Sequence, residues 1–210
     1  MKKISLILGI LLTVSCSSTK FVDSWRNQKI KTFTPKKLLV IGMTDNLTAQ
    51  NIFEEDLKKA FVLRNINAVE STTVLDENFT KTEKSEEEIN QMIKEISAEG
   101  FDAVIITAVK GVKKLNYPPR YYTIGYRWTR FGHYYLNFQD VYYTPQYYES
   151  YKVYNIETSI YYINKEDDKS LVWVGSLELV DPKTIKSTVK KYVDKIIKQL
   201  ERESLIKTIN

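Results

Sequence analysis

The chain has 210 residues, of which 43% are apolar and 27% are charged, so one domain with a substantial core is expected. The formal net charge is +5, and Lys2 and Lys3 account for two of those charges. The remaining charge is too small to indicate a nucleic-acid partner or an acidic partner by itself.

The first residues, MKKISLILGILLTVSCSS, have the layout of a secretory signal. Two lysines are followed by the apolar run Ile4–Val14 and then by small residues. The run is too short to cross a bilayer as a stable helix. Cys16, the only cysteine, lies just after it, so the exported chain is expected to fold without disulfides. The simplest alternative is an unmodified cysteine in an ordinary signal peptide.

The segment Leu12–Cys16, LTVSC, resembles the lipobox of bacterial lipoproteins, although Thr13 stands where an aliphatic residue is usual. The resemblance implies that residues 1–15 are removed and that Cys16 becomes an acylated first residue, carrying palmitate-type chains. Several acyl chains give durable anchoring in a membrane. The short tether 17–20 has no acidic run, so we expect an outer-membrane lipoprotein that faces the periplasm, with residues 16–35 as lipidated tether and arm.

The first half of the domain alternates strands and helices. Apolar runs predict core strands at Leu38–Met43 and Phe101–Val109, and Ala68–Leu75 is a weaker strand. Helical apolar stripes lie between them, one ending near Arg64 and one ending at Gly100. This β-α-β-α-β order with short connections predicts a largely parallel sheet.

Local signals mark the ends of the predicted elements. Ser85 and Glu88 form a capping-box pattern, and Gly100 suits a left-handed helix cap. Asp181 followed by Pro182 predicts the start of the last helix, which we expect to end near Leu205.

The alternating segment Tyr151–Asn164, a charged turn and the second arm Ser170–Val180 predict a β-hairpin before the last helix. Phe21–Phe33 is expected to form an irregular arm or a short edge strand. The fold class is therefore α/β: a two-layer or three-layer-like arrangement around a mixed sheet, with β-α-β-α-β, a Tyr-rich insertion, a hairpin and a C-terminal helix. We expect a single domain over residues 36–206.

The Tyr-rich segment, residues 117–154, is the sharpest functional feature. It holds 12 of the 15 tyrosines, and alternation over residues 122–129 predicts an extended strand. Tyrosine and arginine suit binding surfaces because they offer large contact area, stacking and charge. Candidate partner-binding residues in the insertion 117–150 are Tyr122, Tyr126, Arg127, Trp128, Arg130, Tyr134 and Tyr135.

Three interpretations of this segment stay open. Its aromatics complete the core as added strands, or they contact envelope proteins or a second copy of the chain, or they stack on glycan such as peptidoglycan. Nucleic acid is not expected, because an exported protein lies in the wrong compartment.

Catalytic signals are weak. His133 is the only histidine, and the sequence has no nucleophile elbow, Walker loop or dinucleotide-binding glycine motif. The run Ile41–Asp45 ends a strand where α/β proteins often bind ligands, but we interpret Gly42 as packing or turn chemistry. Glu166, Asp167 and Asp168 are expected to form a solvated turn, not a cation site. We therefore expect no enzyme activity, no metal and no cofactor.

The carboxy-terminal pattern carries a further resemblance. Tyr161-Tyr162, a charged turn, Leu171-Val-Trp173 and Val180-Asp-Pro182 before a basic helix, together with Cys16 and the Tyr-rich insertion, resemble a group of uncharacterised bacterial envelope lipoproteins. Their domain is similar to the amino-terminal domain of TolB and to the periplasmic domain of the curli-secretion lipoprotein. The resemblance covers about residues 36–205 and implies a fold, with no catalytic residues to transfer.

Overall fold

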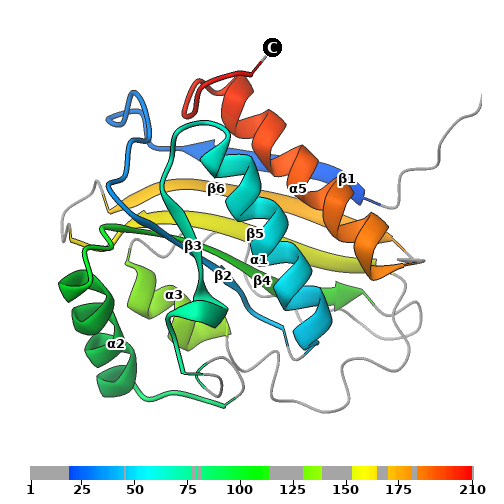
Figure 1. Ribbon diagram of the computed structural model, residues 1–210. Coiled ribbons are helices and arrows are strands. Elements are labelled where there is room, and N and C mark those ends of the chain that lie inside the picture. The colour runs from blue at the N-terminus through cyan, green and yellow to red at the C-terminus, as the bar shows by residue number, and fades with distance from the viewer. Residues whose placement is uncertain are drawn as a thin grey trace, which may run out of the picture.

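The computed structural model describes residues 19–44, 46–76, 79, 82–113, 130–138, 153–164, 170–180 and 184–209. These residues form one six-stranded sheet in the order β1-β6-β5-β4-β2-β3, with helices packed on it (Figure 1). In chain order the elements are β1 Thr19–Arg26, β2 Leu38–Gly42, α1 Leu47–Val62, β3 Ala68–Glu70, the 3₁₀ turn η1 Ser71–Thr73, α2 Glu86–Ala98, β4 Ala103–Lys113, α3 Phe131–Phe138, β5 Val153–Tyr162, β6 Leu171–Val180 and α5 Ile185–Arg202.

The sheet is mixed, and this confirms the α/β class. β2 pairs in parallel with both β3 and β4, as the β-α-β-α-β order predicts. β5 and β6 form the predicted antiparallel hairpin, and β5 also pairs antiparallel with β4. The expectation of a largely parallel sheet is thus correct for only half of it, because the hairpin and the edge strand β1 complete the other half.

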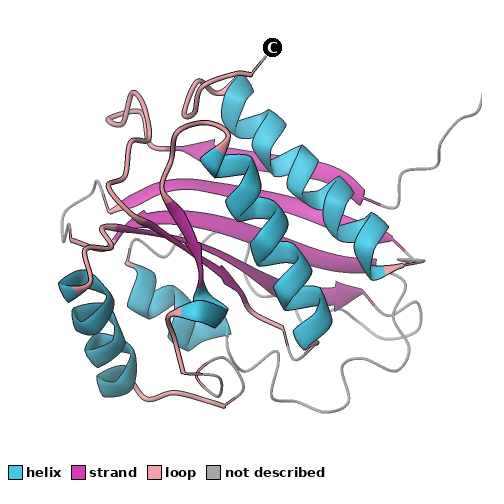
Figure 2. Ribbon diagram, viewed as in Figure 1, coloured by secondary structure: helices cyan, strands magenta, loops and turns pink. Residues whose placement is uncertain are grey.

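Helices cover both faces of the sheet (Figure 2). On one face, Ala103 and Ile105 of β4 pack in a core with residues of α1 and α5. On the other face, Val104 and Ile106 pack in a second core with residues of α2 and α3. All four side chains are fully buried, which explains why β4 is a continuous apolar run and not an alternating one. The domain therefore has three layers.

Four chain segments meet at one end of the sheet, which we call the insertion end. Lys113 at the end of β4 pairs with Val153 at the start of β5, and Val153 pairs with Val180 at the end of β6. On β1, Thr19 pairs with Leu179. Both flanks of the Tyr-rich segment and the start of β1 therefore leave the sheet at the same end.

Three helix-boundary predictions have different outcomes. The capping box of α2 is present: the Glu88 backbone N–H donates to Ser85 Oγ, and the Ser85 N–H donates to the Glu88 carboxylate. Gly100 has the left-handed φ of 88° that its position demands. The predicted cap at Asp181 is wrong, because α5 begins at Ile185 and Thr184 accepts the capping hydrogen bond from the Ser187 N–H.

Strand and helix types also differ from prediction in places. Residues Phe131–Phe138 follow the alternating segment 122–129, carry no helix prediction, and form a helix that presents aromatic rings to the second core. β3 is shorter than predicted, because the chain turns into η1 after Glu70. β1 is the edge strand that the sequence allowed for, and it starts at Thr19, inside the range assigned to tether and arm.

Candidate functional site

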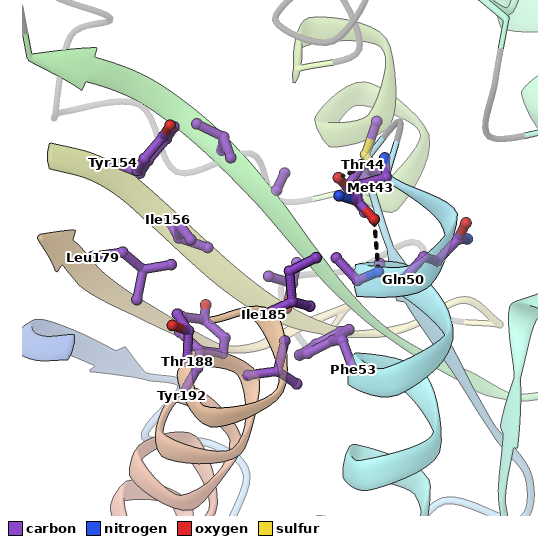
Figure 3. Close-up of a pocket in the computed structure, with 17 residues that line it drawn as sticks. Met43, Thr44, Gln50, Phe53, Tyr154, Ile156, Leu179, Ile185, Thr188 and Tyr192 are labelled. Atoms are coloured by element: carbon purple, nitrogen blue, oxygen red, sulfur yellow. Dashed lines mark hydrogen bonds between the residues drawn. The ribbon is translucent and has the colours of Figure 1, made fainter. Parts of the chain in front are cut away.

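A pocket of about 670 Å³ lies between the N-terminal turns of α1 and α5, over β4, β5 and β6 (Figure 3). Its position matches the strand end Ile41–Asp45 where the sequence allowed for a ligand, although Asp45 itself lies outside the described residues. The volume falls within the range of small-molecule sites. Among the described residues that line the pocket, none carries a charge.

Aromatic rings close the inner end of the pocket. The ring centroids of Phe53 on α1 and Tyr192 on α5 lie 6.0 Å apart in an edge-on arrangement. Gly42, the last residue of β2, makes room for one of them, because a Cβ at this position would lie 3.0 Å from the Phe53 ring. The interpretation of Gly42 as a packing residue is therefore confirmed.

A strip of hydroxyl groups joins two lining residues of the pocket, Thr107 and Tyr192, through the fully buried Thr158. Thr107 Oγ1 lies 2.6 Å from Thr158 Oγ1, which lies 2.7 Å from the Tyr192 hydroxyl. Burial raises the pKa of Tyr192 above its ordinary value, so this phenol stays protonated at physiological pH. The strip can therefore offer hydrogen bonds to a neutral ligand, but Tyr192 is not poised to act as a base.

The Thr188 hydroxyl is a second polar group at the pocket. Thr188 lies on the second turn of α5, and its side chain is 5% exposed. Its Oγ1 is buried and has no hydrogen-bond partner among the described residues. A buried hydroxyl without a partner is destabilising, so a ligand oxygen beside this atom would supply a missing contact.

A buried carboxylate supports the α1 side of the pocket. Glu54 Oε1 accepts hydrogen bonds from the Gly42 N–H at 2.9 Å, from the Gln50 side chain at 3.1 Å and from the Ser71 hydroxyl at 2.7 Å. These contacts join α1 to the end of β2 and to η1. Burial raises the pKa of Glu54 above its ordinary 4.5, and the hydrogen bonds only partly oppose the shift. Glu54 therefore positions Gln50 and Gly42, which line the pocket.

Replacement of Glu54 by glutamine is expected to change how stability depends on pH. Because the folded-state pKa is raised, the folded protein keeps a proton that the unfolded chain loses, so the contribution of Glu54 falls as pH rises from 4.5 through the folded pKa. Glu54→Gln removes this titration. The stability of the natural protein relative to Glu54→Gln should therefore decline between acid and neutral pH, as measured by urea unfolding at both. A difference that stays constant or grows with pH would contradict this assignment.

Two predicted partner-binding residues are buried. Tyr134 and Tyr135 on α3 are 1% and 0% exposed. Tyr134 packs on Tyr161 with ring centroids 5.9 Å apart, and Tyr135 packs on Phe79 at 5.7 Å. These two side chains help to complete the core, and the prediction that they contact a partner is wrong. The helix causes the difference, because it turns both rings toward the sheet.

The other predicted residues are separated from this core or undescribed. Arg130 is exposed just before α3, and His133 is exposed on it. Cys16, Tyr122, Tyr126, Arg127 and Trp128 lie outside the described residues, as does the turn 165–169 with Glu166, Asp167 and Asp168. In the described part of the chain, no group of three or more His, Cys, Asp or Glu residues could hold a metal ion. No described helix is both long enough and apolar enough to cross a membrane.

The sequence marks the end of β2 as a position where α/β proteins often bind ligands, but we interpreted it as packing or turn chemistry, and the α5 half of the pocket was not predicted. Thr188 and Tyr192 interrupt the apolar stripe of α5 with hydroxyl groups. Both are buried, and that pattern of polar residues on a core-facing stripe was the available signal.

Comparison with known proteins identifies no family for this chain. No protein-family model matches the chain, and no curated protein is significantly similar to it. Among solved structures, a PelC dodecamer from Paraburkholderia phytofirmans has 8% sequence identity and a TM-score of 0.39, with 87% of this chain and 95% of that chain covered. A PelC variant from the same organism, also a dodecamer, has the same identity and TM-score, with 85% and 94% covered. Similarity this weak carries no inference about the present chain.

Proposed function

We propose that this protein is a membrane-anchored bacterial lipoprotein, held by acyl chains on Cys16, that acts as a non-catalytic interaction or structural component of the cell envelope. Its partners are other envelope proteins or a second copy of the chain, bound through the Tyr-rich segment. The observation that carries the proposal is that β1, which begins three residues after Cys16, and the two strands that flank the Tyr-rich segment all have those ends at the same end of the sheet.

The strand registers support this arrangement. β1 begins at Thr19, three residues after Cys16, and three extended residues span about 10 Å. Thr19 pairs beside β6, whose last residue Val180 pairs with Val153 at the end of the Tyr-rich segment. An anchor at Cys16 would therefore hold the insertion end of the sheet close to the membrane, where the flanks of the Tyr-rich segment also lie.

Replacement of Cys16 by serine tests the anchor. A serine cannot form the thioether to diacylglycerol, so we expect Cys16→Ser to lose the acyl mass in intact-protein mass spectrometry and to keep residues 1–15, whose removal depends on the modified cysteine. Ser18→Ala, two residues further along, is the matched control and should carry the acyl mass and lose residues 1–15. Absence of acyl mass on the natural protein would reject the lipoprotein assignment.

A further inference from the structure

We propose that the pocket between α1 and α5 binds the acyl-ester portion of a membrane lipid, with the hydrocarbon chain against the apolar wall and the ester carbonyl accepting a hydrogen bond from Thr188. This site is separate from the Tyr-rich segment. The pocket argument itself does not require Cys16 to be lipidated, and only its closeness to a membrane rests on the proposed function.

The apolar residues that line the pocket indicate that part of the ligand is apolar. Phe53 closes the inner end, and Ile156, Leu179 and Val189 extend the apolar surface across β5, β6 and α5 (Figure 3). Hydrocarbon buried on such a surface contributes about 0.8 kcal/mol per CH₂ group. A flexible unbranched chain can follow a wall built from two helices and three strands.

Two observations indicate the polar part of the ligand: the buried Thr188 hydroxyl and the lack of charged side chains among the described lining residues. Within the described part of the chain the buried Thr188 hydroxyl lacks a hydrogen-bond partner, so a ligand that offers an acceptor at this depth would supply one. No described lining residue is a cation that could neutralise a carboxylate. A neutral ester carbonyl therefore fits the site better than the ionised head of a free fatty acid.

The surroundings of the pocket explain how such a ligand would reach it. Ile185, which lines the pocket, is exposed, and so are Val180 and Leu47, each next in sequence to a lining residue. These three apolar side chains lie at the insertion end of the fold, at the start of α1, the end of β6 and the start of α5. The pocket therefore opens beside apolar surface on the side where β1 begins.

Photolabelling tests this proposal. The full-length protein would be placed in phosphatidylcholine vesicles that contain a trace of monoacylglycerol with a diazirine on its acyl chain, irradiated, digested and mapped. We expect labels on peptides of α1 and α5 that contain Gln50 and Val189. A fatty acid with the same diazirine should label these peptides less at neutral pH, because its carboxylate lacks a cation there.

Two substitutions make the test specific. Thr188→Val should lower pocket labelling by about 2- to 12-fold, the effect of one hydrogen bond, and should raise the unfolding midpoint because an unpartnered hydroxyl is removed. Ala49→Phe, on the lining of α1, should abolish labelling by filling the space. The matched controls Thr208→Val and Ala98→Phe, both exposed and outside the pocket, should label normally. Unchanged pocket labelling in Thr188→Val would overturn the proposal even if Ala49→Phe fails to fold.

The source of the ester is tested with Cys16→Ser in the same experiment. Equal pocket labelling in Cys16→Ser and in the natural protein supports a ligand taken from the membrane. Labelling that appears only in Cys16→Ser would overturn that source in favour of the acyl chains of the protein's own anchor. Pocket labelling in a protein shown to carry no acyl group would leave the pocket proposal standing while the anchor proposal fails.

Discussion

Replacement of Trp173 by alanine is expected to lower the free energy of unfolding by about 3–5 kcal/mol, the usual cost of removing a large aromatic ring from a core. Trp173 on β6 is fully buried in the core between the sheet and α1 and α5. Its indole N–H also donates to Glu203 Oε2 at 3.0 Å, just after the end of α5. Alanine would leave a cavity and would remove this link between the sheet and the C-terminal helix.

Equilibrium urea unfolding followed by circular dichroism measures this effect. Val22→Ala on β1 is the matched control, because Val22 is 53% exposed and its truncation should change stability by no more than about 0.5 kcal/mol. A loss below about 1 kcal/mol in Trp173→Ala would contradict the central place of Trp173 in this core.

Replacement of Gly175 by alanine is expected to destabilise the protein by about 1–3 kcal/mol or more, through overpacking. The Trp173 ring lies over Gly175, two residues along the same strand. A Cβ at Gly175 would lie 2.0 Å from Cη2 of that ring and 2.6 Å from Cζ2. No rotation of a methyl group relieves such overlap, so the ring or the strand must move.

A double-mutant cycle isolates the cause of that loss. If the clash with the ring is responsible, Gly175→Ala should cost much less in a Trp173→Leu background, because the shorter side chain does not cover residue 175. Gly111→Ala on β4 is the matched control, since a Cβ there meets nothing within 4 Å. Equal costs of Gly175→Ala in both backgrounds, measured by urea unfolding, would show that the ring contact is not the reason for glycine.

Local sequence signals predicted much of this fold. The β4 run, the α2 capping box and the glycine after α2 each depend on residues within one turn or one strand, so the pattern and the structure agree. The β5–β6 hairpin is equally local, because its two arms are separated only by a short charged turn.

Predictions fail mainly where contacts between residues far apart in the sequence determine the local structure. Phe131–Phe138 has aromatic residues that suit a strand, but a helix places Phe131, Tyr134 and Tyr135 together against the sheet. The start of α5 differs for a local reason: Asp181-Pro182 is the stronger cap signal in the sequence, but Thr184 accepts the capping hydrogen bond.

The site was predictable only in part for the same reason. The end of β2 is visible in the sequence, but the pocket exists because α5, far along the chain, lies beside α1. No local pattern joins Thr188 to Phe53. The buried Glu54 likewise gains its partners Gly42 and Ser71 from separate elements of the fold.

Photo-crosslinking in living cells from position 126, in the Tyr-rich segment, tests the central claim most directly. A photoreactive amino acid would replace Tyr126, and the same residue at Leu63, which is 71% exposed beyond the end of α1, would serve as the control position. An interaction protein that docks through the Tyr-rich segment should give a discrete crosslinked protein from position 126 and not from position 63. No adduct from position 126, in protein that is folded and anchored, would contradict a partner-binding role for this segment.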